Sequence, residues 1–186
     1  MSFSSTVTRR LSIAAAVAGV AATLALPATA TAQMRLEPVR VTAARWAEAN
    51  ALTEKAVSLY STPKKYKYAA SLHMRAANLR APGDSAGFSD LSMAGHLYRA
   101  AGDLLSARAA MERAAEHAAA RGDVYNAAKA YVDAGFLAIE EHRSDRVPAL
   151  ALKAELLAKS PLLSDEQRAS IMGRVGYSQV VATIQR

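Results

Sequence analysis

Apolar residues recur at steps of three and four along much of the chain, which is the spacing of one face of an α-helix. The first such stripe consists of Trp46, Ala49, Leu52, Ala56 and Leu59. It predicts a helix over residues 42–60, ending where Ser61-Thr62-Pro63 interrupts the pattern. A second stripe predicts a helix over residues 64–80 and consists of Tyr68, Leu72, Ala76 and Leu79.

Turn residues divide the next part of the chain into three further helices. Ala81-Pro82-Gly83-Asp84 ends the second helix, and Ser89 is the expected N-cap of a third that runs to residue 101. A fourth follows the turn at Gly102-Asp103 and runs to residue 120. Its inward stripe consists of Leu104, Ala107, Met111, Ala114 and Ala118. A fifth follows Gly122-Asp123 and runs to about residue 141.

Capping residues predict two more helices. The sixth is capped by Ser144 or Asp145, carries Pro148 in its first turn and ends near residue 159. Ser164 and Gln167 form a capping box, which opens a short seventh helix that ends at Gly173 or Gly176. Seven helices with short turns and no strand pattern predict an all-α fold.

Part of the pattern repeats. Segments 94–102 and 127–135 share Ala, small-residue, Tyr, Ala and Gly positions at an offset of 33 residues. Gly-Asp pairs also recur at 83, 102 and 122, a spacing close to one helix plus one turn. Small residues allow paired helices to approach closely, and glycine ends a helix in a conformation that other residues resist. The repetition therefore predicts a stack of helical hairpins.

The unit around Tyr98 resembles the tetratricopeptide repeat family, whose unit spans about 34 residues. With Tyr98 at position 11, the family's small residues at 8, 20 and 27 are Gly95, Ala107 and Ala114, while Gly102 stands at position 15 and Met111 replaces the aromatic at 24.

The neighbouring units match this pattern less fully. The third matches only in its first helix, through Ala128, Tyr131 and Gly135, before an insertion at residues 142–147. The first is degenerate: Trp46 and Tyr60 lie in its first helix, and its second is represented by Ala70, Met74, Ala77 and Pro82. The resemblance implies a short right-handed superhelical stack of about three units over residues 42–160, with residues 161–186 as a C-terminal capping helix and tail. The alternative is an alanine-rich helical bundle with coincidental tyrosine spacing.

The same resemblance implies a site, because the first helices of successive units in this family line a concave groove that holds a peptide. The second unit would offer Ser92, His96 and Arg99, the third would offer Tyr125, Lys129 and Asp133, and the first would add Glu54 and Ser58. Arg99, His96 and Lys129 on one surface would suit a carboxylate of a partner. The alternative is that these side chains form ordinary solvated helix faces.

Residues 1–32 resemble a secretory signal peptide, followed by a linker at 33–41. Arg9 and Arg10 form its positive region, residues 11–26 an apolar run, and Ala30 and Ala32 the small residues before a cleavage site after Ala32. The run of about 16 residues is short for a membrane span, so cleavage is preferred to an uncleaved anchor. Export to the periplasm or the medium follows, and no later segment predicts a span.

Composition narrows the chemistry. The formal charge of +7 falls to +5 without Arg9 and Arg10 and is spread among acidic residues, which disfavours a nucleic-acid binder. The chain has no cysteine, and its four histidines lack the spacing of a metal site. Glu140-Glu141-His142 is interpreted as a solvated helix end, and segment 64–68 as a helix start with Tyr68 in the core and solvated lysines. No catalytic motif or cofactor motif occurs.

Two functions remain in view. The first is an exported module that binds a protein or peptide partner in the groove, without a cofactor, metal or catalytic residue. The alternative is a self-associating structural protein or accessory subunit of an envelope complex, with an alanine-rich face that makes a homo-oligomer.

Overall fold

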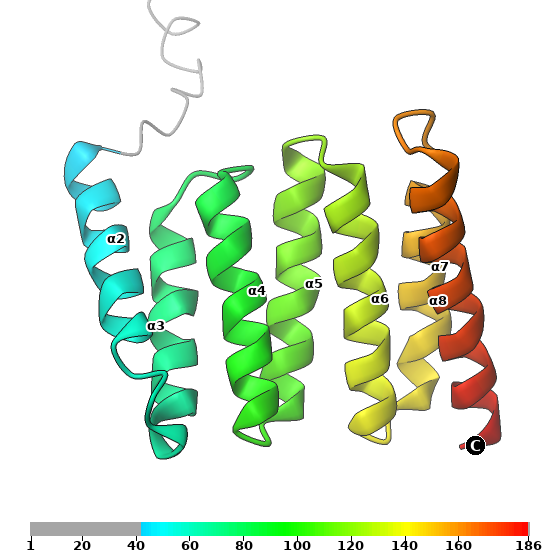
Figure 1. The fold of residues 1–186 in the computed structure, drawn as a ribbon, viewed down its shortest axis with the longest axis horizontal. Coiled ribbons are helices and arrows are strands. Elements are labelled where there is room, and N and C mark those ends of the chain that lie inside the picture. The colour runs from blue at the N-terminus through cyan, green and yellow to red at the C-terminus, as the bar shows by residue number, and fades with distance from the viewer. Residues whose placement is uncertain (1–41, 186) are drawn as a thin grey trace, which may run out of the picture. The chain divides into compact units, whose positions relative to one another are not determined.

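A computed structural model describes residues 42–185 and shows seven α-helices and two short 3₁₀ helices in that range (Figure 1). The elements are α2 (Ala43–Val57), η1 (Pro63–Lys65), α3 (Tyr66–Leu79), α4 (Ser85–Ala100), α5 (Leu104–Ala120), α6 (Val124–Glu140), η2 (Ser144–Arg146), α7 (Val147–Ala158) and α8 (Asp165–Ile184). The described residues contain no β-strand. The predicted all-α fold is confirmed.

Each helix from α2 to α7 packs against the next one in the chain, and α8 packs against both α6 and α7. Figure 1 shows them side by side in a single row, with α4, α6 and α8 nearer the viewer than α5 and α7. The described part of the chain is therefore a stack of helical hairpins, as expected. Its contacts are mostly local, because each helix meets mainly its neighbours in sequence.

Two turns between helices are closed by glycine. At Gly102 and Gly122 the backbone has φ of +77°, a conformation that a side chain disfavours. After each glycine, the N–H of the aspartate donates to a carbonyl five residues earlier, which is the Schellman motif at a helix end. The carboxylates of Asp103 and Asp123 then accept from backbone N–H groups in the first turn of the next helix.

The third Gly-Asp pair corrects one predicted boundary. Gly83 has φ of +82°, and the Asp84 carboxylate accepts from the N–H of Ala86 at 2.8 Å. Helix α4 therefore begins at Ser85, and the expectation that Ser89 caps it is wrong. Ser89 lies inside the helix, one turn after its start, where its hydroxyl donates to the carbonyl of Ser85. Aspartate serves better here because the preceding glycine presents it at the point where the chain turns.

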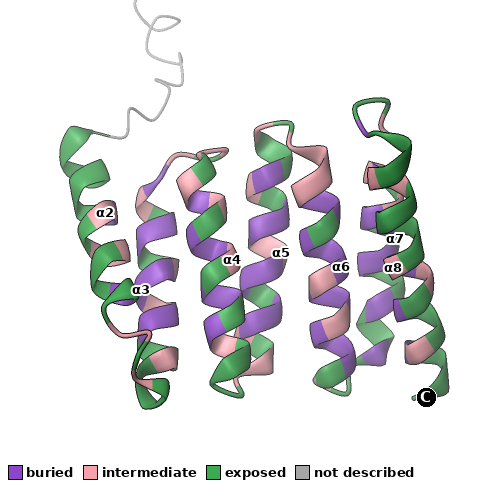
Figure 2. Ribbon diagram, viewed as in Figure 1, coloured by how far each residue is buried: buried purple, intermediate pink, exposed green. Residues whose placement is uncertain are grey.

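The core consists mainly of alanine, and the buried positions form continuous stripes along α3 to α7 (Figure 2). The predicted inward stripe of α5 is confirmed at Ala107, Met111, Ala114 and Ala118, while Leu104 is half-buried. Among the described residues, the largest side chains that are less than 2% exposed are Leu72, Leu91, Val147 and Val175. Alanine at the contacts lets the helix backbones approach closely, so the core is stabilised by close contacts between helices rather than by large side chains.

Two aromatic residues of the predicted apolar stripes, Trp46 and Tyr68, are exposed. The guanidinium of Arg80 lies 5.3 Å from the centre of the Trp46 ring. The ammonium of Lys55 lies 5.9 Å from the centre of the Tyr68 ring. The expectation that Tyr68 enters the core is wrong because α3 begins only at Tyr66, after a 3₁₀ turn, and its buried face is set by its alanines, Leu72 and His73. Tyr66 packs against that core instead.

The last two helices also differ from expectation. Neither Ser144 nor Asp145 caps α7, because both lie in η2 directly before it, while Pro148 occupies the first turn as predicted. The Ser164–Gln167 capping box is present. Helix α8 does not end at Gly173 or Gly176 but continues to Ile184. Both glycines therefore lie inside a helix of 20 residues.

The predicted signal peptide and linker, residues 1–41, lie outside the described residues. Among residues 42–185, no helix has the length and apolarity to cross a membrane.

Candidate functional site

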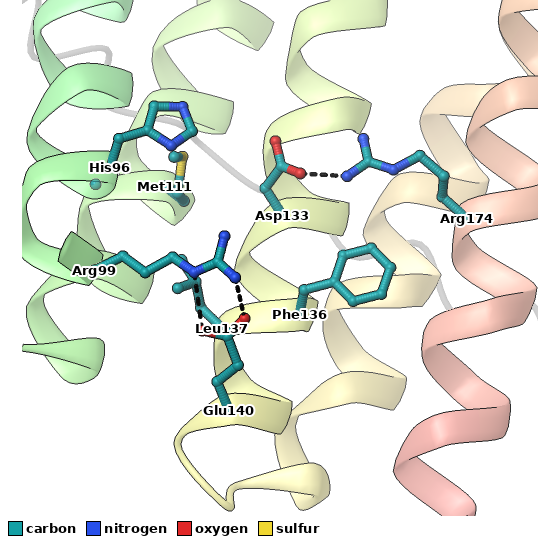
Figure 3. Close-up of a pocket in the computed structure, with 9 residues that line it drawn as sticks. His96, Arg99, Met111, Asp133, Phe136, Leu137, Glu140 and Arg174 are labelled. Carbon is teal, nitrogen blue, oxygen red and sulfur yellow. Dashed lines mark hydrogen bonds and ion pairs between the residues drawn. The ribbon is translucent and has the colours of Figure 1, made fainter. Parts of the chain in front are cut away.

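A groove lies between α4 and α6, with α5 beneath it (Figure 3). It consists of two adjoining hollows of about 220 and 290 Å³ that share His96, Met111 and Asp133. The first hollow is completed by Gly95, Arg99, Phe136, Leu137, Glu140 and Arg174, and the second by Phe88, Ser92, Asn126, Lys129 and Ala130. These two hollows are called the α4–α6 groove below.

The floor of the groove depends on a glycine in α4. Gly95 is buried, and a Cβ atom built there would lie 2.8 Å from Cε and 3.0 Å from Cγ of Met111. The side chain of Met111 therefore occupies the space that any other residue at 95 would need. Because glycine has no side chain, Met111 of α5 can pack directly against the backbone of α4 at Gly95.

Arg99 on one wall pairs with Glu140 on the other. The guanidinium donates two hydrogen bonds to the carboxylate, from Nε at 2.9 Å and from Nη2 at 2.5 Å. A bidentate pair of this kind fixes the orientation of both side chains. Both are partly solvated, so the pair contributes little to stability. It closes the end of the groove nearest the turns after α4 and α6.

Asp133, in the middle of α6, pairs with Arg174 of α8. The guanidinium of Arg174 also lies 5.5 Å from the ring of Phe136, and that ring lies 6.0 Å from the ring of Tyr177. Figure 3 shows Arg174 reaching from α8 towards α6 on the side away from Arg99. The last helix thus completes the wall of the groove.

Two basic groups of the groove remain without a partner. Neither His96 nor Lys129 makes a hydrogen bond or an ion pair with any residue that the structure describes, and both are exposed. The remaining charged side chains of the groove are Arg99, Arg174, Asp133 and Glu140, which pair with one another. With histidine neutral, Lys129 therefore leaves the groove with a net positive charge.

Most of the residues predicted to contact a partner meet here. The groove is lined by Ser92, His96, Arg99, Lys129 and Asp133. Tyr125 is not among its lining residues, because it is half-buried and packs against the main core. Glu54 and Ser58 lie on or directly after α2, outside this groove. Sequence reasoning missed Phe136, Glu140 and Arg174. In each of the two ion pairs, Arg99–Glu140 and Asp133–Arg174, the partners lie 41 residues apart along the chain. No local sequence pattern signals a pair at that separation.

A second polar cluster lies away from the groove, among α2, α3 and α4. The Asp90 carboxylate contacts Nδ1 of His73 at 2.8 Å and accepts from Nε of Arg80 at 2.8 Å and from Thr53 at 2.9 Å. Nε2 of His73 meets the hydroxyl of Tyr60 at 2.5 Å. These five residues are called the Asp90 network below. No pattern along the chain signals this network, because its residues lie on three helices and in turns.

Burial governs what the Asp90 network can do. Burial by itself raises the pKa of the Asp90 carboxyl, but hydrogen bonds from His73, Arg80 and Thr53 outweigh it and hold that pKa below its ordinary value. His73 and Asp90 are each only 3% exposed. A tyrosine, a histidine and an aspartate in a row have the composition of a proton relay, but a substrate has no direct access to the buried pair. The network therefore joins helices.

The acidic pair at the end of α6 does not converge on one site. Glu140 reaches Arg99 of α4, whereas Glu141 accepts from Nε of Arg108 of α5 at 2.8 Å. Within residues 42–185, no three His, Cys, Asp or Glu side chains lie close enough to hold a metal ion. Comparison with protein-family models, with curated proteins and with solved structures finds no match to this chain.

Proposed function

We propose that this chain is a tetratricopeptide-like interaction module that binds a short segment of another protein in the α4–α6 groove. One observation carries the proposal. His96 and Lys129 face the same hollow without a partner, although every other charged side chain of the groove is paired. Paired side chains already have a counter-charge within the chain, whereas these two are free to meet a ligand.

The chemistry of the groove selects an acidic segment with an apolar neighbour. Lys129 supplies the unpaired charge, and His96 offers a ring nitrogen on the opposite wall. Met111 and Phe136 supply apolar surface in the adjoining hollow. A carboxylate between the two basic groups, followed by an apolar side chain over Met111, would use both hollows. The proposal assigns no catalytic residue, cofactor or metal. It places the function after export, once residues 1–32 have been removed.

The test is the selection of a peptide from a random library displayed on phage, with the full chain as bait. Selected peptides are expected to carry Asp or Glu. Their affinity is expected to fall about tenfold or more in Lys129→Glu, because one attraction becomes a repulsion. Lys65→Glu is the matched control, since Lys65 is exposed and lies in η1, away from the groove.

The proposal fails if the selected peptides bind Lys129→Glu as tightly as the original chain. It also fails if Lys65→Glu weakens them to the same degree, because the effect would then reflect net charge rather than the groove.

A further inference from the structure

The face of α8 that points away from α6 and α7 carries few charges. From Ala169 to Gln185 the only charged residue is Arg174, and it is paired with Asp133 of α6. Large apolar side chains take the place of charges: Tyr177 is 64% exposed, Val180 59% and Ile184 79%. An open hollow of about 430 Å³ lies beside them, lined by Gly176, Val180 and Ile184 among others.

The glycines of α8 have no explanation within the chain. Gly173 and Gly176 lie inside a regular helix, where each costs about 1 kcal/mol relative to alanine. No atom lies within 4 Å of a Cβ atom built at either position, so neither glycine makes room for a neighbouring helix. Glycine on an exposed helix face permits close approach of another backbone from outside.

The order of small and large residues on this face is self-complementary. Ala169, Gly173 and Gly176 occupy its first half, and Tyr177, Val180 and Ile184 occupy its second half. When a second α8 is laid antiparallel with its midpoint between 176 and 177, each small residue falls opposite a large one. Position 169 then meets 184, position 173 meets 180, and position 176 meets 177.

We propose that α8 is a dimer seam, on which two copies of this chain pack their α8 helices antiparallel about a two-fold axis. In such an interface residue i meets j while j meets i, which is the relation that the small and large positions obey. A foreign helix would not require this face to be complementary to itself. A helix lying on a membrane would carry lysine or arginine along its polar side, and α8 has none beyond Arg174 after residue 168.

Helix α7, packed beside α8, also exposes Leu152 and Leu156. A typical stable interface buries about 800 Å² per partner, and the exposed large side chains of α8 supply part of that area. At the two-fold axis Gly176 of one copy faces Tyr177 of the other, and the two backbones supply further contact there. The dimer seam lies on α8's outer face and leaves the α4–α6 groove open.

The experiment is sedimentation equilibrium of the full chain, expressed from its first residue, with the mass of one protomer measured separately. A dimer is expected. Gly173→Gln is expected to raise the dimer dissociation constant at least 100-fold, because the longer side chain collides with Val180 of the other copy. The same change suits the isolated helix, since glutamine is the better helix former, so circular dichroism should show an intact fold.

Two further variants make the test specific. Ala109→Gln is the matched control, because Ala109 is an exposed small residue of α5, and it should leave the dissociation constant unchanged. Gly173→Leu combined with Val180→Ala exchanges the small and large positions and should restore a dimer that Gly173→Leu alone abolishes. A chain that stays monomeric at every concentration overturns the proposal. A dimer that survives Gly173→Gln also overturns it, because the copies would then meet elsewhere.

Discussion

At the scale of single residues, the ends of α4, α5 and α6 share one hydrogen-bonding pattern but not one residue type. Gly102 and Gly122 close the first two ends with φ of +77°. His142 closes the third with φ of +58°, and the N–H of Arg143 donates to the carbonyl of Ala138 at 2.8 Å, as the aspartates do in the other two. A side chain in this conformation is strained, since the left-handed region costs roughly 1 kcal/mol or more for a residue with a Cβ atom.

The strain at residue 142 predicts the effect of a substitution. His142→Gly is expected to raise the free energy of unfolding by about 1 kcal/mol, because glycine adopts this conformation without the Cβ clash. The measurement is urea unfolding followed by circular dichroism. Gly122→Ala is the converse control and should lower the free energy of unfolding by a similar amount. Equal stability of His142→Gly and the original chain would show that the turn relaxes around histidine at no cost.

At the scale of elements, α2 and the neighbouring helices are joined by the Asp90 network as well as by alanine contacts. Asp90 comes from α4, His73 from α3 and Thr53 from α2, while Arg80 directly follows α3. Arg80 also donates to Asn50 of α2 at 3.1 Å. A buried carboxylate that has three donors holds its neighbours only while it is ionised, so the joint between these helices depends on pH.

The sign of that dependence follows from the lowered pKa of Asp90. Since the folded-state pKa lies below the unfolded value of about 3.9, the ionised carboxyl stabilises the fold above about pH 4 and this contribution is lost as the pH falls through the folded-state pKa. Asp90→Asn is expected to lower the free energy of unfolding at pH 7 by about 3 kcal/mol, because it leaves Arg80 buried without its counter-charge.

Urea unfolding at pH 7 and near pH 3 checks this expectation. The difference between Asp90→Asn and the original chain should shrink at the lower pH, because the Asp90 carboxyl of the unfolded chain is then largely protonated and ionising it on folding costs free energy. Asp145→Asn is the control, because the Asp145–Arg143 pair lies in solvent and should matter little at either pH. A difference of the same size at both pH values would mean that the loss comes from packing rather than from charge.

At the scale of the whole molecule, the groove and the proposed dimer seam lie on different faces of the stack. Ion pairs that join α4 to α6 and α6 to α8 line the groove face, while the last helix presents an uncharged face outwards. Groove binding and pairing through the dimer seam would therefore use different helix faces, which meet where Tyr177 of the seam packs against Phe136 of the groove, and a dimer would carry two grooves. Two linked grooves bind a partner with two matching segments more tightly than one groove does.

Export is the remaining prediction for the whole chain. If residues 1–32 are a signal peptide, expression of the full sequence in a secreting bacterial host should yield a protein that begins at Gln33, because Ala30 and Ala32 precede that bond. Intact-mass measurement and N-terminal sequencing of the protein in the periplasmic fraction check the site. Ala32→Leu should block cleavage at this bond. A product that still begins at Met1 would favour the uncleaved anchor.

Sequence alone determined the features that depend on neighbours along the chain. Helix positions followed from apolar residues at steps of three and four, and the turns at 83, 102 and 122 followed from glycine, whose conformational freedom is local. The same local reasoning failed at two helix ends, where other residues decided whether the helix begins or stops. Ser89 lost its capping role to Asp84, and two glycines did not end α8 because its other residues and its packing against α6 and α7 sustain the helix.

Only the tertiary structure decided which side chains are used and which remain free. The resemblance to the repeat family placed Arg99 and Asp133 on the groove face, but their partners Glu140 and Arg174 lie 41 residues away and become neighbours only when alternate helices align. The Asp90 network arises in the same way, from helices whose sequences show no sign of one another. Spacing along one helix fixes the direction of a side chain, whereas its partner depends on packing between helices, and that packing is what left His96 and Lys129 unpaired.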